Sequence, residues 1–320
     1  MGISAPVKAP RHPSLVVFVL AALIGASATA LAQSDESGLP ELPPRVWLGP
    51  DGEPLPFQTH DEILEFLRTA EVVDIAEIPE GITRPRRVLL EKDGIRMHAV
   101  FRDVDLEIKG ERVADRFWTV FRDEDQSEVA AYRLARMLGM DNVPPAVPRQ
   151  IGRSEGSLQI WLEGVMTEES RRDERLQSPY PREWFLQNRM MSVFDNLIWN
   201  SDRNLGNMLI DADWKFWLID HTRAFQDTGD LRSPEEITHV ERTFWERLQA
   251  LDEEQIRAQL GELIDGSALR SLLTRRERLI RLIEELIAER GEDVVIFDWD
   301  STTRRPSRWP AAADGPRTPR

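Results

Sequence analysis

Residues 192–225 read SVFDNLIWNSDRNLGNMLIDADWKFWLIDHTRAF, and in this segment apolar runs alternate with short polar breaks. The pattern predicts a helix that ends near Asn200, then a loop, then two short strands at 208–210 and 214–219. A second loop begins at Asp220. A chain with this order of elements folds back on itself, because a hairpin returns the backbone to its starting edge.

Three polar residues, Asp202, Asn207 and Asp220, lie at these breaks. Each taken alone is a common turn or cap residue. Their order around a predicted hairpin instead indicates one site, with a carboxylate that could accept the proton of a hydroxyl and two oxygen ligands for a metal. We therefore expect Asp202 to act as base or to orient an acceptor hydroxyl, and Asn207 with Asp220 to hold Mg²⁺ or Mn²⁺, as phosphoryl transfer requires.

The charge balance excludes some functions. Lys and Arg total 41 against 56 Asp and Glu, so the net charge is −15. We expect no nucleic-acid partner, because an acidic surface repels a phosphate backbone. The chain has no cysteine, which excludes disulfides and thiol nucleophiles.

Residues 1–32 have the pattern of a secretory signal peptide. Lys8 and Arg11 precede the apolar run SLVVFVLAALIGASATALA, and small residues precede a cleavage point before Gln33. We expect an exported protein, in a bacterial periplasm or outside the cell. The alternative is an uncleaved segment that anchors the domain to a membrane.

The rest of the chain predicts a β-rich part followed by a helical part. Residues 33–56 are rich in Pro, Gly and acids and are expected to form a linker or an extended arm, and residues 301–320 a disordered tail. The expected elements between them are a helix at 60–69, a β-hairpin at about 87–104 around Lys92-Asp93-Gly94, a helix at 125–138, a strand at 157–161, a helix at 181–199, the hairpin described above, and helices beyond 233 that include 274–289.

Several motifs resemble the atypical branch of the kinase-like superfamily. SDRNLGNMLI (201–210) is similar to the catalytic loop of phosphoinositide and HipA-type kinases, and LIDHTRAF (218–225) is similar to their metal-binding Asp motif. HAVFRDVD (98–105) and SEVAAYRLARMLGMDNVPPAV (127–147) are similar to a strand and a helix of the secretory-pathway kinases, the Golgi casein-kinase and four-jointed group. The resemblance covers roughly residues 80–290.

The resemblance implies an α+β, two-lobed kinase-like fold with a small β-rich N-lobe at 57–160 and a mainly helical C-lobe at 161–300. ATP and Mg²⁺ or Mn²⁺ would be the cofactors. It makes Arg102 the phosphate-binding cation of the strand and Glu128 the acid of the helix. The segment SLQIWLEGVM (157–166) would be the hinge that meets an adenine, through Leu162 and Gly164.

Residue by residue, the resemblance also makes Asp202 the catalytic Asp and Asn207 and Asp220 the metal ligands. The implied activity is transfer of a nucleotide γ-phosphoryl group to a hydroxyl of a protein, sugar or lipid.

Two departures keep an alternative open. Those kinases usually have Lys where this chain has Arg102, whose planar fork presents its donors differently, and no Gly-rich loop is recognisable. ATP is also scarce outside a bacterial cytoplasm. The alternative is a pseudokinase that binds nucleotide, metal or a partner protein without turnover. Glu128 has its own alternative, because it lies three residues after Asp125 and that spacing also fits a capping box.

Overall fold

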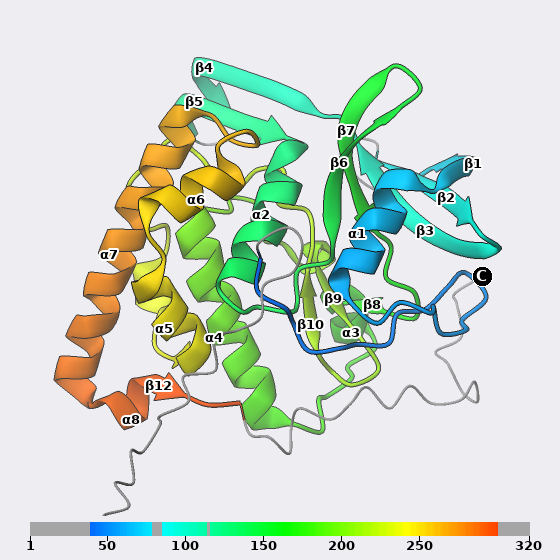
Figure 1. Cartoon of the computed structure of the whole chain (residues 1–320). Helices are drawn as coiled ribbons and strands as arrows, with labels where there is room; N and C mark the ends of the chain where they lie inside the picture. The colour runs from blue at the N-terminus through cyan, green and yellow to red at the C-terminus, as the bar shows by residue number, and fades with distance from the viewer. Residues whose placement is uncertain (1–38, 79–84, 114–115, 300–320) are drawn as a thin grey trace, which may run out of the picture. The chain divides into compact units, whose positions relative to one another are not determined.

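The computed structural model describes residues 39–78, 85–113 and 116–299 (Figure 1). The expected signal peptide and the expected tail at 301–320 lie outside the described residues. None of the described helices is both long and apolar enough to cross a membrane.

The first half of the chain forms a five-stranded sheet in the order β1-β2-β3-β7-β6, with every neighbouring pair antiparallel. Its strands are β1 (Glu71–Glu77), β2 (Arg86–Lys92), β3 (Ile95–Arg102), β6 (Ala146–Ile151) and β7 (Ser154–Ile160). The predicted β2–β3 hairpin is confirmed, and its turn residues Asp93 and Gly94 have φ of 52° and 77°. Two consecutive positive φ values match the twist of the paired strands, which explains the Asp-Gly sequence.

Two helices accompany the sheet, α1 (His60–Thr69) and α2 (Gln126–Met137), as expected. A capping box begins α1, in which Thr59 and Glu62 satisfy each other's backbone N–H groups. The second helix, α2, packs on β6 and β7 and also on a helix of the second half, and almost all of its residues are buried. Figure 1 shows α2 between the sheet and the long helices. It therefore belongs to the core of both halves.

The second half is mainly helical, which agrees with a two-lobed layout. Its long helices are α4 (Pro181–Ile198) and α7 (Gly266–Arg290), and the predicted hairpin is present as β9 (Met208–Ile210) and β10 (Phe216–Leu218). The shorter elements are β8 (Met166–Thr167), α3 (Glu168–Asp173), η1 (Leu205–Asn207), η2 (Pro234–Glu236), β11 (Val240–Glu241), α5 (Arg242–Ala250), α6 (Glu253–Leu260), α8 (Glu292–Val295) and β12 (Ile296–Phe297).

Two features differ from the sequence-based expectation. Residues 39–56, expected to form a linker or an extended arm, contain no helix or strand beyond isolated bridges. Leu39, Trp47 and Leu55 are buried in the main core, so this segment, which we call the N-terminal arm, is an arm packed on the fold, a contact that the sequence did not indicate. A further hairpin, β4 (Asp105–Val113) with β5 (Arg116–Glu124), was not predicted. β5 ends beside α2 and, as described below, contributes to the site.

Candidate functional site

The β9–β10 hairpin brings the loop of Asp202 and Asn207 next to the loop of Asp220. Leu218 pairs with Met208, and the backbone N–H of Ile219 then donates to the carbonyl oxygen of Asn207 at 3.3 Å. The side-chain amide of Asn207 donates to the carbonyl oxygen of Asp202 at 2.9 Å. Hydrogen bonds through Asn207 therefore join its loop to Asp202 and to Ile219, the residue that precedes Asp220.

The loop before Asn207 is shaped by asparagines. Asn204 Oδ1 accepts from the backbone N–H groups of Gly206 and Asn207, at 2.9 and 3.2 Å. Asn200 Oδ1 accepts from the N–H of Asp202 at 3.1 Å. These bonds give acceptors to the N–H groups of Gly206 and Asp202 and add to the bond from the Asn207 N–H to the Asn204 carbonyl oxygen, so side chains of the loop help to fix its conformation.

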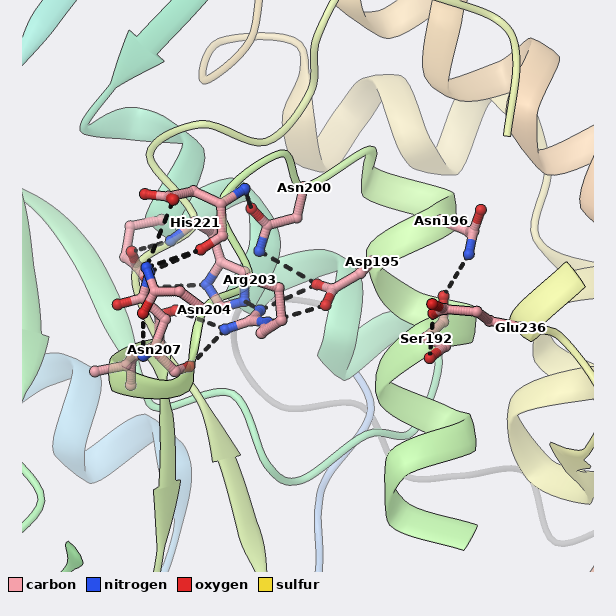
Figure 2. Close-up of polar contacts among 12 residues, drawn as sticks. Ser192, Asp195, Asn196, Asn200, Arg203, Asn204, Asn207, His221 and Glu236 are labelled. Atoms are coloured by element: carbon pink, nitrogen blue, oxygen red, sulfur yellow. Dashed lines mark hydrogen bonds and ion pairs between the residues drawn. The ribbon is translucent and has the colours of Figure 1, made fainter. Parts of the chain in front are cut away.

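Arg203 joins the loop to its neighbours. Its guanidinium forms two bonds with the carboxylate of Asp195 in α4, at 2.9 and 3.0 Å. It also donates to the carbonyl oxygens of Asn207 and Ile219, at 2.6 and 2.8 Å. Figure 2 shows Arg203 between Asp195 and His221. Arg203 therefore pairs within the fold, with Asp195, His221 and two backbone carbonyl oxygens.

Glu128, the acid of the helix, forms no ion pair with Arg102 among the described contacts. Its side chain is 0% exposed, and it accepts from the N–H of His221 at 2.8 Å, from His221 Nδ1 at 2.9 Å and from Gln159 Nε2 at 2.8 Å. The capping-box alternative is wrong, because Asp125 makes no side-chain cap bond to α2. The helix acid therefore holds the loop that follows Asp220.

The ring of His221 connects Glu128 to Arg203. Arg203 Nη2 lies 3.0 Å from His221 Nε2, and since a guanidinium only donates, Nε2 accepts and the proton is on Nδ1, facing Glu128. Burial disfavours the charged form of Glu128, but His221, Arg102 and the N–H of His221 outweigh it and lower the pKa of the carboxyl to about 2. Glu128 is therefore ionised although its side chain is completely buried.

Arg102 is at the end of β3, 6% exposed, with its Nε 3.9 Å from Asp220 Oδ1. Its Nη1 is buried and has no hydrogen-bond partner among the described residues. Gly156 on β7 permits this placement, because a Cβ there would lie 2.1 Å from the carbonyl oxygen of Arg102. The structure thus brings the predicted cation to Asp220.

Asp220 has φ of 58°, a left-handed conformation that side chains other than Gly, Asn and Asp rarely adopt. Its Oδ1 accepts from the hydroxyl of Thr222 at 3.2 Å. Strained backbone positions of this kind cluster at functional sites, which agrees with the role expected for this residue.

Arg223 and Asp123 belong to the site and were missed by the sequence reasoning. Arg223 Nε lies 2.8 Å from Asp123 Oδ2, on β5, and its Nη1 lies 3.2 Å from Asp202 Oδ2. Burial disfavours the charge of Arg223, but Asp123, Asp202 and Asp220 together raise the pKa of its guanidinium. One available signal was the presence of a cation three residues after Asp220 in the same motif.

Leu162 and Gly164, which were predicted to contact an adenine, make no contact with Asp202, Asn207 or Asp220 among the described contacts. Leu162 packs against the main core and lines a cavity of about 660 Å³ whose lining includes none of Asp202, Asn207 and Asp220. Gly164 is exposed in a turn, with φ of 66°. The hinge segment is held by a bond from the N–H of Trp161 to the carbonyl of His98, at 3.0 Å. Within the described ranges, no cluster of three or more His, Cys, Asp or Glu residues could hold a metal.

No protein-family model and no curated protein sequence matches the chain. Solved structures do. A structure of hydra Fam20 with sugar has a TM-score of 0.60 at 16% identity, with 74% of this chain and 92% of that chain covered. The Golgi casein kinase has a TM-score of 0.52 at 16% identity, with 74% and 77% covered. Its structure with Mn/ADP bound has a TM-score of 0.52 at 16% identity, with 76% and 80% covered. The chain therefore has a kinase-like fold, similar to those of Fam20 and the Golgi casein kinase.

Proposed function

We propose that this chain is an exported, ATP-dependent phosphotransferase that moves the γ-phosphoryl group of a nucleotide to a hydroxyl of a protein, sugar or lipid. The observation that carries the proposal is the hydrogen-bonded junction of the two loops, from Asn207 to Asp202 and from Ile219 to Asn207. The kinase-like fold supports it, and one similar structure has Mn/ADP bound. Export rests on the N-terminal signal pattern.

Asp202 is the residue we assign to the acceptor hydroxyl. Its side chain is 36% exposed, so an incoming hydroxyl has access to it. Oδ2 meets Arg223, whereas Oδ1 has only a 3.5 Å contact with Asn204 among the described residues. Oδ1 is therefore the oxygen that would accept the hydroxyl proton.

Asn207 and Asp220 fit a divalent metal. The amide NH₂ of Asn207 is engaged by the carbonyl of Asp202, which leaves the amide oxygen as a ligand. An amide oxygen and a carboxylate suit Mg²⁺ or Mn²⁺, whose remaining ligands come from water and nucleotide phosphates. When bound, the metal would offset the negative charge of the phosphates.

Two arginines supply positive charge to the same region. The buried, unpartnered Nη1 of Arg102 is a donor that a phosphate oxygen would satisfy. Arg223 is 25% exposed beside Asp202, where negative charge on a transferred phosphoryl group would develop. Fixed donors of this kind stabilise charge without reorganising during the reaction.

A pseudokinase is the second candidate, and two observations favour it. Arg102 makes no ion pair with Glu128 among the described contacts, so the usual cation–acid pair is replaced by the Glu128–His221 pair. Arg223 also occupies one oxygen of Asp202. Either feature would slow transfer while leaving nucleotide binding intact.

The experiment is a thermal-shift assay of the purified protein with ATP and Mg²⁺ or Mn²⁺, followed by a labelled-phosphate transfer assay. Asp220→Ala should remove the metal-dependent shift, whereas Asp202→Ala should keep the shift and lose transfer. Asp74→Ala, an exposed acid on β1, is the matched control. No shift in the wild-type protein refutes nucleotide binding, and full transfer by Asp202→Ala refutes the role of that residue.

Arg102→Lys separates the two candidates further. A lysine would present a compact ammonium in place of the planar fork. A gain in transfer would show that Arg102 limits turnover, whereas a shift without transfer in both proteins supports the pseudokinase.

A further inference from the structure

The cavity of about 660 Å³ is separate from the site described above. It is enclosed by the N-terminal arm, the loop after α2, the hinge segment, the start of α4 and the turn between β9 and β10. We call it the arm cavity. Its volume is within the range of about 300–1,000 Å³ that is typical of small-molecule sites.

An incompletely satisfied ion pair lies in its wall. Lys215 Nζ is 2.5 Å from Asp141 Oδ2, and an Arg45 nitrogen is 3.5 Å from the same oxygen. Among the described residues, no other residue donates a hydrogen bond to Asp141 Oδ1, and two N–H groups of Lys215 have no acceptor. These side chains remain 34% and 24% exposed. The wall therefore presents a free acceptor beside free donors.

Burial and Arg45 disfavour the charge of Lys215 and lower its pKa to about 8, although Asp141 and Asp211 act in the opposite direction. At neutral pH most of the pair is still ionised. A ligand that enters the cavity must replace the water on both groups, because burying either without a hydrogen bond is costly.

Aromatic rings form much of the remaining wall. They are Trp47, Trp161, Tyr180, Trp214, Trp217, Phe244 and Trp299. Trp47 and Trp217 lie 5.4 Å apart between ring centroids, and the Arg45 guanidinium lies 4.2 Å from the Trp217 centroid. Rings of this kind offer large, flat, apolar contact surfaces.

The charges around the cavity disfavour an anionic ligand, and its two cations already lie where a cationic ligand would bind. Six carboxylates and two cations line it, so an anion would be repelled. A cation would meet Arg45 and Lys215, which already lie over the Trp217 ring. A hydroxyl both donates and accepts, so neighbouring hydroxyls on one ring would bond Asp141 and Lys215 together.

We propose that the arm cavity binds an uncharged, polyhydroxylated ring compound, a small sugar or a cyclitol, with its hydroxyls on Asp141 and Lys215 and its C–H face on the tryptophans. The lining of the arm cavity includes none of Asp202, Asn207 and Asp220, although it does include Leu162 of the hinge segment.

The test is calorimetric titration of the purified full chain, without nucleotide, together with its tryptophan fluorescence. The neutral probes are glucose, galactose, maltose and myo-inositol, and the charged probes are choline chloride and inorganic phosphate. At least one neutral probe should bind and change the fluorescence, and neither charged probe should bind. Lys215→Met and Asp141→Asn should each weaken binding about tenfold or more.

Lys109→Met is the matched control, since Lys109 also pairs with a carboxylate at 2.5 Å but is 68% exposed on β4. It should bind like the wild type. If Lys215→Met fails to fold, Asp141→Asn serves in its place, because it keeps the side-chain shape and should show the same loss of binding. The proposal is overturned if no neutral probe binds, if a charged probe binds instead, or if binding is lost in Asp202→Ala and retained in Lys215→Met.

Discussion

Replacing Glu128 with Gln should destabilise the fold by about 3 kcal/mol at pH 7. The carboxyl has a pKa of 4.5 when unfolded and about 2 in the fold, and each pH unit of difference corresponds to about 1.4 kcal/mol. The geometry agrees with this magnitude. Glu128 Oε1 accepts from Gln159 Nε2 and His221 Nδ1, and Oε2 accepts from the N–H of His221. The NH₂ group of a glutamine at this position would therefore face a donor in either orientation.

The stability difference between the wild type and Glu128→Gln should depend on pH. Because folding lowers the pKa of Glu128, its stabilisation is complete above about pH 4.5 and is lost as the pH falls towards 2. The difference between wild type and Glu128→Gln should therefore shrink between pH 5 and pH 3. Urea unfolding followed by tryptophan fluorescence measures both quantities.

The matched control is Glu163→Gln. Glu163 also pairs with a histidine, at 2.6 Å from His98 Nδ1, but its side chain is 22% exposed. A partly exposed pair contributes little, so this variant should lose less than about 1 kcal/mol. A loss below about 1 kcal/mol for Glu128→Gln, or a loss that is constant from pH 7 to pH 3, would refute the reasoning.

Two further variants test the packing around the site. Gly156→Ala should lower the free energy of unfolding by about 2 kcal/mol or more, because the added Cβ would collide with the Arg102 carbonyl oxygen. The control is Gly152→Ala, whose φ is 61° and whose Cβ would meet open space, and it should lose only about 1 kcal/mol. Thermal unfolding measures both. Burial raises the pKa of Asp125 to about 7, so the folded chain holds a proton that the unfolded chain releases, and stability from this group falls as pH rises from about 4 to 7. Asp125→Asn should therefore raise the melting temperature at pH 8 and flatten its change between pH 5 and 8; an unchanged slope contradicts the assignment.

The elements that could be predicted from the sequence are those whose signal is local. Asp93-Gly94 specifies the turn of the β2–β3 hairpin, and the apolar spacing of 181–199 specifies α4. The junction of Asn207 with the loop of Asp220 followed from one predicted hairpin. These inferences needed no knowledge of how distant parts pack.

The remaining features depend on packing between distant segments. Glu128 bonds to His221, and Arg223 to Asp123, only because α2 and β5 both pack beside the loop after β10. No spacing within one segment encodes such a pair. The composition of the N-terminal arm predicts only a linker or an extended arm, and it does not indicate that Trp47 packs in the core.

The left-handed backbone conformation at Asp220 has a cost that another residue would avoid. A left-handed residue is most easily glycine, and a non-glycine residue there costs about 1 kcal/mol. A change to glycine would relieve that cost, but it would also remove the hydrogen bond from Thr222 and the contact with Arg102. The acid at this position is therefore held against a backbone preference, which is the balance expected where a carboxylate has a chemical task.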